Sequence, residues 1–143
     1  PLNHWAAKKK SLKFSDLVNE RFLMREPGSA TRMVFETWLR EKNYQLHHTL
    51  QIESNEVIRM SVETGLGLAV LSEHTLAQTN AKVALLPVKD FPLTSHWYLV
   101  RHSDRRLPVA AHNFIQYLKA HLHEWVDEKY VGNELGLLLD GGE

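Results

Sequence analysis

The six residues at 66–71, Leu-Gly-Leu-Ala-Val-Leu, constrain the fold more than any other stretch of the chain. They follow Gly65, a residue suited to the left-handed turn that ends a helix. A short, continuously apolar run between turn signals is typical of a strand that is buried on both faces of a parallel sheet. Because a parallel sheet needs helices to cover it, this run predicts an α/β fold.

The other predicted elements alternate along the chain between strands and helices. Strands are predicted at 21–25, 48–52, 83–88 and 96–101. Helices are predicted at 16–20 behind a Ser15 cap, at 30–42, from Ser54 or Asn55 to Gly65, at 74–80 and at 108–128. Strands that alternate with helices indicate an α/β class with a mainly parallel sheet.

Apolar side chains recur at helical spacing in the longer helices. The expected buried faces are Met33, Val34, Phe35 and Trp38 in the first, Val57, Ile58 and Val62 in the second, and Ala111, Ile115, Leu118, Leu122 and Trp125 in the last. The tail from 129 to 143 is rich in glycine and leucine, and we expect it to be partly disordered.

The composition is that of a globular protein. The 143 residues contain no cysteine, which removes disulfides and thiolate chemistry and is compatible with the cytoplasm. No run of 18 apolar residues is present, and no apolar stretch follows the lysines at 8–10, so we expect neither a transmembrane helix nor a signal peptide. The first residue is Pro1, and we expect the chain to be a piece of a longer protein.

The formal net charge of zero hides a gradient along the chain. Residues 1–50 carry nine Lys/Arg and five Asp/Glu, a balance of +4, and residues 51–143 carry eight and twelve, a balance of −4. Neither value approaches the strongly basic surface of a nucleic-acid reader. We therefore expect that these residues do not themselves hold DNA.

The strongest local signal for a binding site is the segment 25–32, Arg-Glu-Pro-Gly-Ser-Ala-Thr-Arg, between a predicted strand and a predicted helix. A helix start presents unpaired N–H groups and a positive dipole end, which favour an anion. Ser29 and Thr31 add hydroxyls, and Arg32 adds a cation suited to carboxylate or phosphate. The alternative interpretation is that Ser29 only caps the helix while Arg32 pairs with Glu26 or Glu36.

A second polar helix start, Ser54-Asn55-Glu56, follows another strand end. Ligands of open parallel sheets collect at the carboxyl ends of the strands, where such loops converge. The two helix starts together therefore predict half of a small-ligand pocket. Taken alone, a serine in the position of Ser54 is more often only a cap.

Metal binding, cofactor binding and catalysis have little support in the sequence. The nine histidines show no His-x-x-x-His or Glu-x-x-His spacing, and we expect no metal site. The segment Gly65-Leu66-Gly67 follows a helix and lacks the third glycine of a dinucleotide fingerprint, so no cofactor is expected. The pattern Gly-x-Ser-x-Gly is absent. We therefore do not expect an enzyme.

Three segments together resemble the sensor domain of LysR-type transcriptional regulators. They are FLMREPGSATR at 22–32, SNEVIR at 54–59 and VETGLGLAVLS at 62–72. The segments FPL at 91–93, WYLV at 97–100 and RRLP at 105–108 are similar to the subgroup that controls RuBisCO and CO2-fixation operons. Ala30, Trp5 and Thr64 depart from the usual residues of the family. The resemblance covers about residues 4–120.

The resemblance implies part of a two-subdomain sensor, similar to a type 2 periplasmic binding protein, with Rossmann-like subdomains. Residues 1–98 would be the second subdomain with a crossing segment, and 99–128 the return strand and last helix of the first, before a tail at 129–143. The family's effector-contacting helix starts correspond to Ser29, Thr31, Arg32, Ser54 and Asn55 in this sequence.

The same resemblance implies the partners. We expect a small anionic or phosphorylated metabolite as the effector, operator DNA held through a helix-turn-helix outside this chain, a homodimer or tetramer, and a cytoplasmic location without membrane contact. The alternatives are a periplasmic-type solute-binding protein, a LysR-type regulator of a different operon, or an enzyme on the same architecture.

Overall fold

The computed structural model describes residues 1–77, 79–102, 104–127 and 130–131. The chain divides into two compact units, Pro1–His96 and the part from Trp97 on. The first unit contains the sheet, and the second contains the long helix α4 (Val109–Trp125). The tail predicted at 129–143 lies, apart from Tyr130 and Val131, outside the described residues.

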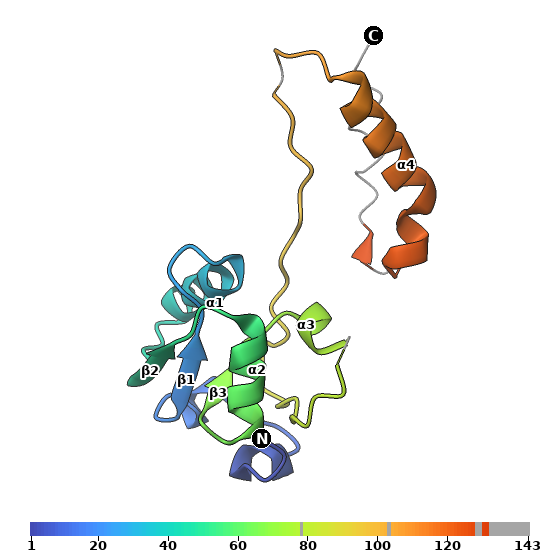
Figure 1. Cartoon of the computed structure of the whole chain (residues 1–143). Helices are drawn as coiled ribbons and strands as arrows, with labels where there is room; N and C mark the ends of the chain where they lie inside the picture. The colour runs from blue at the N-terminus through green and yellow to red at the C-terminus, as the bar shows by residue number, and fades with distance from the viewer. Residues whose placement is uncertain (78, 103, 128–129, 132–143) are drawn as a thin grey trace. The chain divides into compact units, whose positions relative to one another are not determined.

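A three-stranded parallel sheet forms the centre of the first unit (Figure 1). Its strands are β1 (Arg21–Met24), β2 (His48–Gln51) and β3 (Leu68–Ala69), in the order β2-β1-β3. The middle strand, β1, pairs with both neighbours. Between β2 and β3 the chain therefore passes from one side of β1 to the other.

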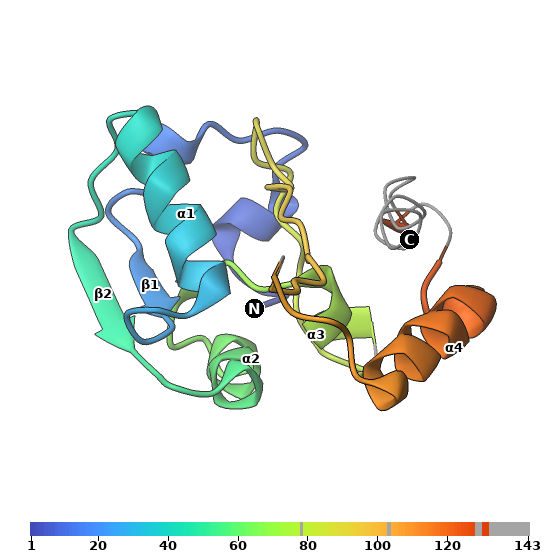
Figure 2. The ribbon, with the colours of Figure 1, turned by 90° about the horizontal axis from the view of Figure 1, so that it is seen from above.

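Helices α1 (Ala30–Glu41) and α2 (Asn55–Glu63) make the two connections. They lie on opposite sides of the sheet (Figure 2). Right-handed crossovers require this, because the two connections run in opposite directions across the sheet. The short helix α3 (Glu73–Ala77) and two 3₁₀ turns, Trp5–Lys8 and Phe14–Asp16, complete the helical elements of this unit's described residues.

The apolar core lies under α1 and includes side chains from the amino-terminal turns. Phe22 and Met24 of β1 belong to it, whereas Leu23 is buried on the opposite face, as the alternation of a strand requires. The central strand is thus covered on both sides. The buried residues of the cluster are Ala6, Leu12, Phe14, Leu17, Phe22, Met24, Phe35, Trp38, Leu39 and Leu68.

The predicted α/β class with a parallel sheet is confirmed. The strands predicted at 21–25 and 48–52 and the helices predicted at 30–42, 54–65 and 108–128 are present, with ends that differ by at most three residues. The strand predicted at 66–71 is shorter. Leu66 N–H still bonds to Ser61 O at the end of α2, so β3 begins only at Leu68.

The helix predicted at 16–20 is wrong. The structure has a 3₁₀ turn at Phe14–Asp16 instead, in which Asp16 Oδ2 accepts a hydrogen bond from Lys13 N–H at 3.0 Å. This bond starts the turn before the expected Ser15 cap. The earlier start brings Phe14 and Leu17 into the core.

The strand predicted at 83–88 is also wrong. In the described residues it contributes one isolated parallel bridge, between Leu12 and Val88. Leu12 N–H donates to Pro87 O at 3.0 Å, and Lys89 N–H donates back to Leu12 O at 2.9 Å. Pro87 has no N–H group with which to extend the ladder, so the pairing stops there.

No strand forms at 96–101 within the described part of the chain. The sequence pattern is apolar, but Trp97 is 89% exposed and Val100 is similarly open. A strand needs a partner strand in register, and the described residues show no strand pairing at 96–101. The apolar pattern alone therefore did not predict the structure.

The buried faces of α1 and α2 differ in part from those predicted. Phe35, Trp38 and Leu39 are buried in α1, and Met33 is 56% exposed. The spacing i, i+3, i+4 keeps the three buried residues on one stripe, which Met33 does not share. Ile58 is buried in α2, whereas Val57, the adjacent position, is exposed.

The apolar stripe predicted in α4, the helix of the second unit, is half-buried. Ala111, Ile115, Leu118 and Leu122 are all partly covered, and no described residue of this helix is fully buried. Trp125, predicted to belong to the stripe, is exposed.

Candidate functional site

The carboxyl end of β1 lies where the strand order reverses, and the chain enters α1 from this end of the strand. In open parallel sheets this position is the usual ligand site. The start of α2 reaches the same place, because the Arg25 guanidinium, one residue past β1, donates from Nη1 to Asn55 Oδ1 at 2.6 Å. The structure thus brings together the two helix starts that the sequence singled out.

A tight turn at 26–29 connects β1 to α1. Ser29 N–H donates to Glu26 O at 3.2 Å, which closes the turn. Pro27 occupies its second position and Gly28, with φ of +92°, its third. This is the pattern of a type II turn, in which glycine accepts the positive φ that other residues resist. The turn fixes where α1 begins.

Ser29 is the N-cap residue of α1, but its side chain makes no capping hydrogen bond. Its carbonyl accepts from Met33 N–H at 2.9 Å. Thr31 lies in the uncapped first turn, half-buried like Ser29. The interpretation that the Ser29 hydroxyl only caps the helix is therefore not supported, and the first N–H groups of α1 have no side-chain cap.

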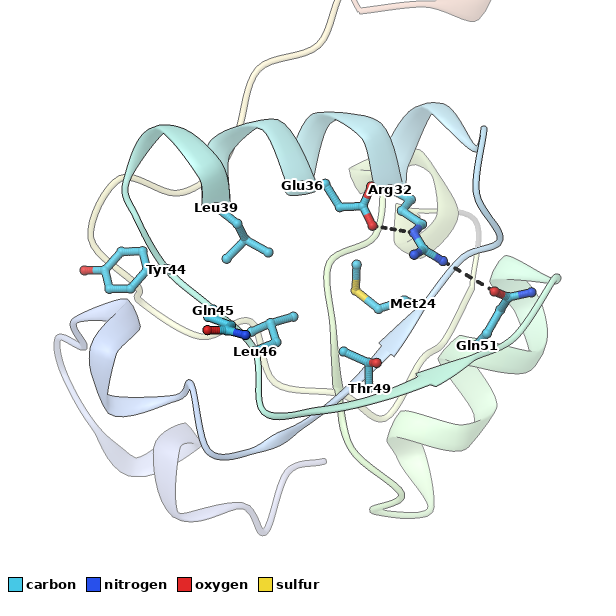
Figure 3. Close-up of a pocket in the computed structure, with 9 residues that line it drawn as sticks. All are labelled: Met24, Arg32, Glu36, Leu39, Tyr44, Gln45, Leu46, Thr49 and Gln51. Carbon is cyan, nitrogen blue, oxygen red and sulfur yellow. Dashed lines mark hydrogen bonds and ion pairs between the residues drawn. The ribbon is translucent and has the colours of Figure 1, made fainter.

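Arg32 is engaged within the protein (Figure 3). Its Nε donates to Glu36 Oε1 at 2.6 Å, and its Nη1 donates to Arg25 O at 2.8 Å and to Gln51 Oε1 at 3.4 Å. The structure thus contains the Arg32–Glu36 ion pair that the alternative interpretation predicted. Arg32 ties the end of β1 to α1 and to β2.

Ser54 is the N-cap residue of α2, and its Oγ accepts from Val57 N–H at 3.3 Å. For Ser54 the capping interpretation is therefore correct. Asn55, the first residue of the helix, has its Oδ1 taken by Arg25. The two helix starts differ: α2 is capped by its own side chain, and α1 is not.

Arg25 and Glu26 lie in the segment 25–32 that the sequence singled out, but they were not among the predicted ligand residues. Arg25 Nε and Nη2 donate to the two carboxylate oxygens of Glu26, each at 2.8 Å. This hydrogen bonding holds the pKa of Glu26 below its ordinary range and raises the pKa of Arg25. The adjacency of a cation and a carboxylate in the sequence could have predicted the Arg25–Glu26 ion pair. It could not have predicted the contact of Arg25 with Asn55, which is far away in the sequence.

The Arg25–Glu26 pair predicts a pH-dependent contribution to stability. Because the folded-state pKa of Glu26 is lowered from 4.5, this contribution is complete above that value and is lost as the pH falls through the lowered pKa. We expect Glu26→Gln to lower the urea midpoint at about pH 7, and the difference from the wild type to shrink toward about pH 3. A difference that stays constant over this range would contradict the assignment.

A cavity of about 320 Å³ lies beside this site, between α1 and β2 (Figure 3). Met24, Leu39 and Tyr44 give it an apolar side, and Arg32, Glu36 and Gln51 give it a polar side. Of the five predicted site residues it includes Arg32 alone. The cavity therefore shares Arg32 with the first turn of α1, and it contains no residue of the start of α2.

The described residues contain no group of three or more His, Asp or Glu side chains placed to hold a metal ion. None of the helices in that same part of the chain combines the length and hydropathy that a bilayer crossing requires.

Residues 1–123 match the family described as LysR substrate binding domain. The chain is 39% identical over 120 residues to the HTH-type transcriptional activator CmpR of Synechocystis sp., an alignment that covers 82% of this chain and 40% of that protein. It is 35% identical over 120 residues to the RuBisCO operon transcriptional regulator of Allochromatium vinosum, with the same coverage.

A solved structure is also similar. It is the Synechocystis PCC6803 CcmR regulatory domain in complex with 2-PG, with a TM-score of 0.76 and 31% identity over 83% of this chain and 58% of that one. The chain spans about two fifths of the length of the curated relatives named above. The family expected from the sequence motifs is confirmed: the chain belongs to the LysR substrate-binding-domain family.

Proposed function

We propose that this chain is the effector-sensing part of a LysR-type transcriptional regulator of CO2-fixation genes. It binds a small anionic or phosphorylated metabolite through Ser29 and Thr31 at one helix start and Ser54 and Asn55 at the other. The observation that carries the proposal is the meeting of these helix starts at the carboxyl end of β1. The similar CcmR structure, solved with 2-PG, supports an anion of this kind.

The chemistry of the helix starts favours an anion. The uncapped first turn of α1 offers N–H groups and the positive end of its dipole. The Ser29 hydroxyl, free of a capping bond, adds a donor. Arg32 contributes positive charge, but its hydrogen bonds to Glu36 and Arg25 O give it a supporting role rather than that of the main ligand.

The proposed mechanism is a population shift between two arrangements of two subdomains. We assign residues 1–98 to the second subdomain with a crossing segment, and 99–128 to the returning segment and last helix of the first, although this segment forms no strand in the described residues. An effector that contacts both subdomains favours one arrangement. The regulator's fit to its operator then changes with effector concentration.

The remaining partners lie outside the chain. We propose that a helix-turn-helix elsewhere in the longer protein holds operator DNA, that the regulator acts in the cytoplasm as a homodimer or tetramer, and that the site binds without catalysis. The complete reading frame tests the first point directly. A helix-turn-helix upstream supports the proposal, and an export signal there contradicts it.

Removing either serine hydroxyl is expected to weaken effector binding. The test ligand is 2-phosphoglycolate, the 2-PG of the similar CcmR structure. In the protein expressed from the complete reading frame, calorimetry with this compound should give a micromolar dissociation constant. Ser29→Ala and Ser54→Ala should each weaken binding by about 1–3 kcal/mol, the usual scale for hydrogen bonds to charged groups. Ser54→Ala should also lose about 1 kcal/mol of stability as a cap, whereas Ser29→Ala should lose little.

Ser11→Ala is the matched control, because Ser11 is exposed and lies outside both helix starts. Its affinity should equal that of the wild type. Glycolate, which lacks the phosphate, should bind more weakly than 2-phosphoglycolate. Unchanged affinity in both site variants would remove the assignment of the site to these helix starts.

A further inference from the structure

The Arg25 guanidinium bridges the two helix starts. Its Nε and Nη2 hold Glu26, in the turn that leads to α1, and its Nη1 holds Asn55, the first residue of α2. The contact between Arg25 and Asn55 spans 30 positions of sequence. It crosses the carboxyl end of β1, where ligands of open sheets bind.

This contact also determines which way the Asn55 amide faces. A guanidinium has only donors, so the amide oxygen must point toward it. The amide NH₂ is then directed away from Arg25, and none of the hydrogen bonds described for this part of the chain occupies it. Without Arg25, the amide can rotate and present its oxygen, an acceptor that repels an anion.

Arg25 in addition neutralises the carboxylate nearest to the start of α1. Arg32 also lowers the pKa of Glu26, so part of this compensation remains when Arg25 is removed. The backbone of Arg25 is fixed as well, because Arg32 Nη1 donates to its carbonyl at 2.8 Å. Half-buried side chains and several simultaneous bonds leave Arg25 little freedom to move.

We propose that Arg25 is a positioning residue of the anion site, which sets the amide of Asn55 as a donor and holds the two helix starts in register. This inference rests on the function proposed above. Arg25 acts through Asn55, so its contribution to affinity depends on the presence of the Asn55 amide.

A double-mutant cycle tests this dependence. In the protein from the complete reading frame, Arg25→Gln and Asn55→Ala should each weaken the binding of 2-phosphoglycolate about tenfold, measured by calorimetry. The double variant should also weaken it about tenfold, and not the hundredfold of independent sites. Arg25→Lys, which can donate to one partner but not form the fork, should fall between wild type and Arg25→Gln.

Arg40→Gln is the control for charge. Arg40 lies at the other end of α1, is exposed and bonds to Thr37 of the same helix, so its removal changes net charge equally without touching the site. Its affinity should stay within about twofold of the wild type. Unfolding curves without ligand identify any variant whose fold is damaged, and affinities are compared at a temperature where every variant is folded.

The outcomes separate the two proposals. If the wild type binds 2-phosphoglycolate but the losses of the two single variants add in the double variant, the positioning role is overturned and the proposed function stands. The same holds if Arg25→Gln binds as tightly as the wild type. A wild-type protein that binds neither 2-phosphoglycolate nor inorganic phosphate overturns the proposed function, and the positioning role with it. Non-additive losses together with an unaffected Arg40→Gln support both.

Discussion

Replacing Phe14 by alanine is expected to destabilise the first unit by about 3–5 kcal/mol, the usual range for large core aromatics. Phe14 is 2% exposed, and its ring lies 4.9 Å from that of Trp38 and 5.0 Å from that of Tyr44. It also contacts Phe22 and Phe35. Since domains of this size are stable by only about 5–15 kcal/mol, much of the stability would be lost. Urea unfolding followed by intrinsic fluorescence measures the loss.

Two matched variants give this prediction its contrast. Phe14→Leu keeps most of the apolar volume and should lose clearly less than Phe14→Ala. Leu85→Ala removes a side chain in the same unit that is 79% exposed, and its effect should stay within about 0.5 kcal/mol. If Phe14→Ala and Leu85→Ala shifted the urea midpoint equally, Phe14 would not be the centre of the aromatic cluster.

Phe14 also shows where prediction from the sequence stops. Strands β1 and β2 and helices α1 and α2 were predictable because their signals are local: apolar runs, polar caps and turn residues such as Gly28. The burial of Phe14 depends on rings from α1, from β1 and from Phe91, far along the chain. No periodicity within 11–20 contains that information.

The missing strands have a similar explanation. The residues at 83–88 and 96–101 have the composition of strands, but a strand requires a partner that offers backbone groups in register. Within the described residues the former makes a single β-bridge, between Val88 and Leu12, and the latter takes part in no strand pairing. Composition indicates that a segment can form a strand, but the topology of the fold determines whether a partner strand lies beside it.

The candidate site was predictable to a comparable extent. Both helix starts follow from local sequence, and the pairing of Arg32 with Glu36 follows from the i, i+4 spacing. The free hydroxyl of Ser29 does not follow, because a serine before a helix usually caps it. Nor does the contact of Arg25 with Asn55, which exists only because β1 and α2 meet in the folded sheet.

Replacing Gly67 by alanine is the second change for which we expect a large loss. A Cβ atom at this position would lie 2.5 Å from the backbone oxygen of Arg21 and 3.3 Å from Leu23 Cδ2. The oxygen belongs to β1, so relief of the clash requires movement of the sheet backbone itself. We expect Gly67→Ala to destabilise the unit by about 1–3 kcal/mol, the range for overpacked positions, measured by urea unfolding.

Gly28→Ala is the comparison that distinguishes a steric clash with a neighbouring strand, expected at Gly67, from strain of the backbone dihedral, expected at Gly28. A Cβ at Gly28 meets nothing within 4 Å. The loss of stability in Gly28→Ala should therefore reflect only the strain of the positive φ, about 1 kcal/mol. Gly67→Ala should exceed this, and it should speed amide exchange at Leu68 and Ala69, which pair with β1 at two positions only. Equal losses without faster exchange would mean that β3 tolerates displacement. A larger loss for Gly67→Ala would instead show that the absence of a side chain before β3 is what allows this strand to approach β1.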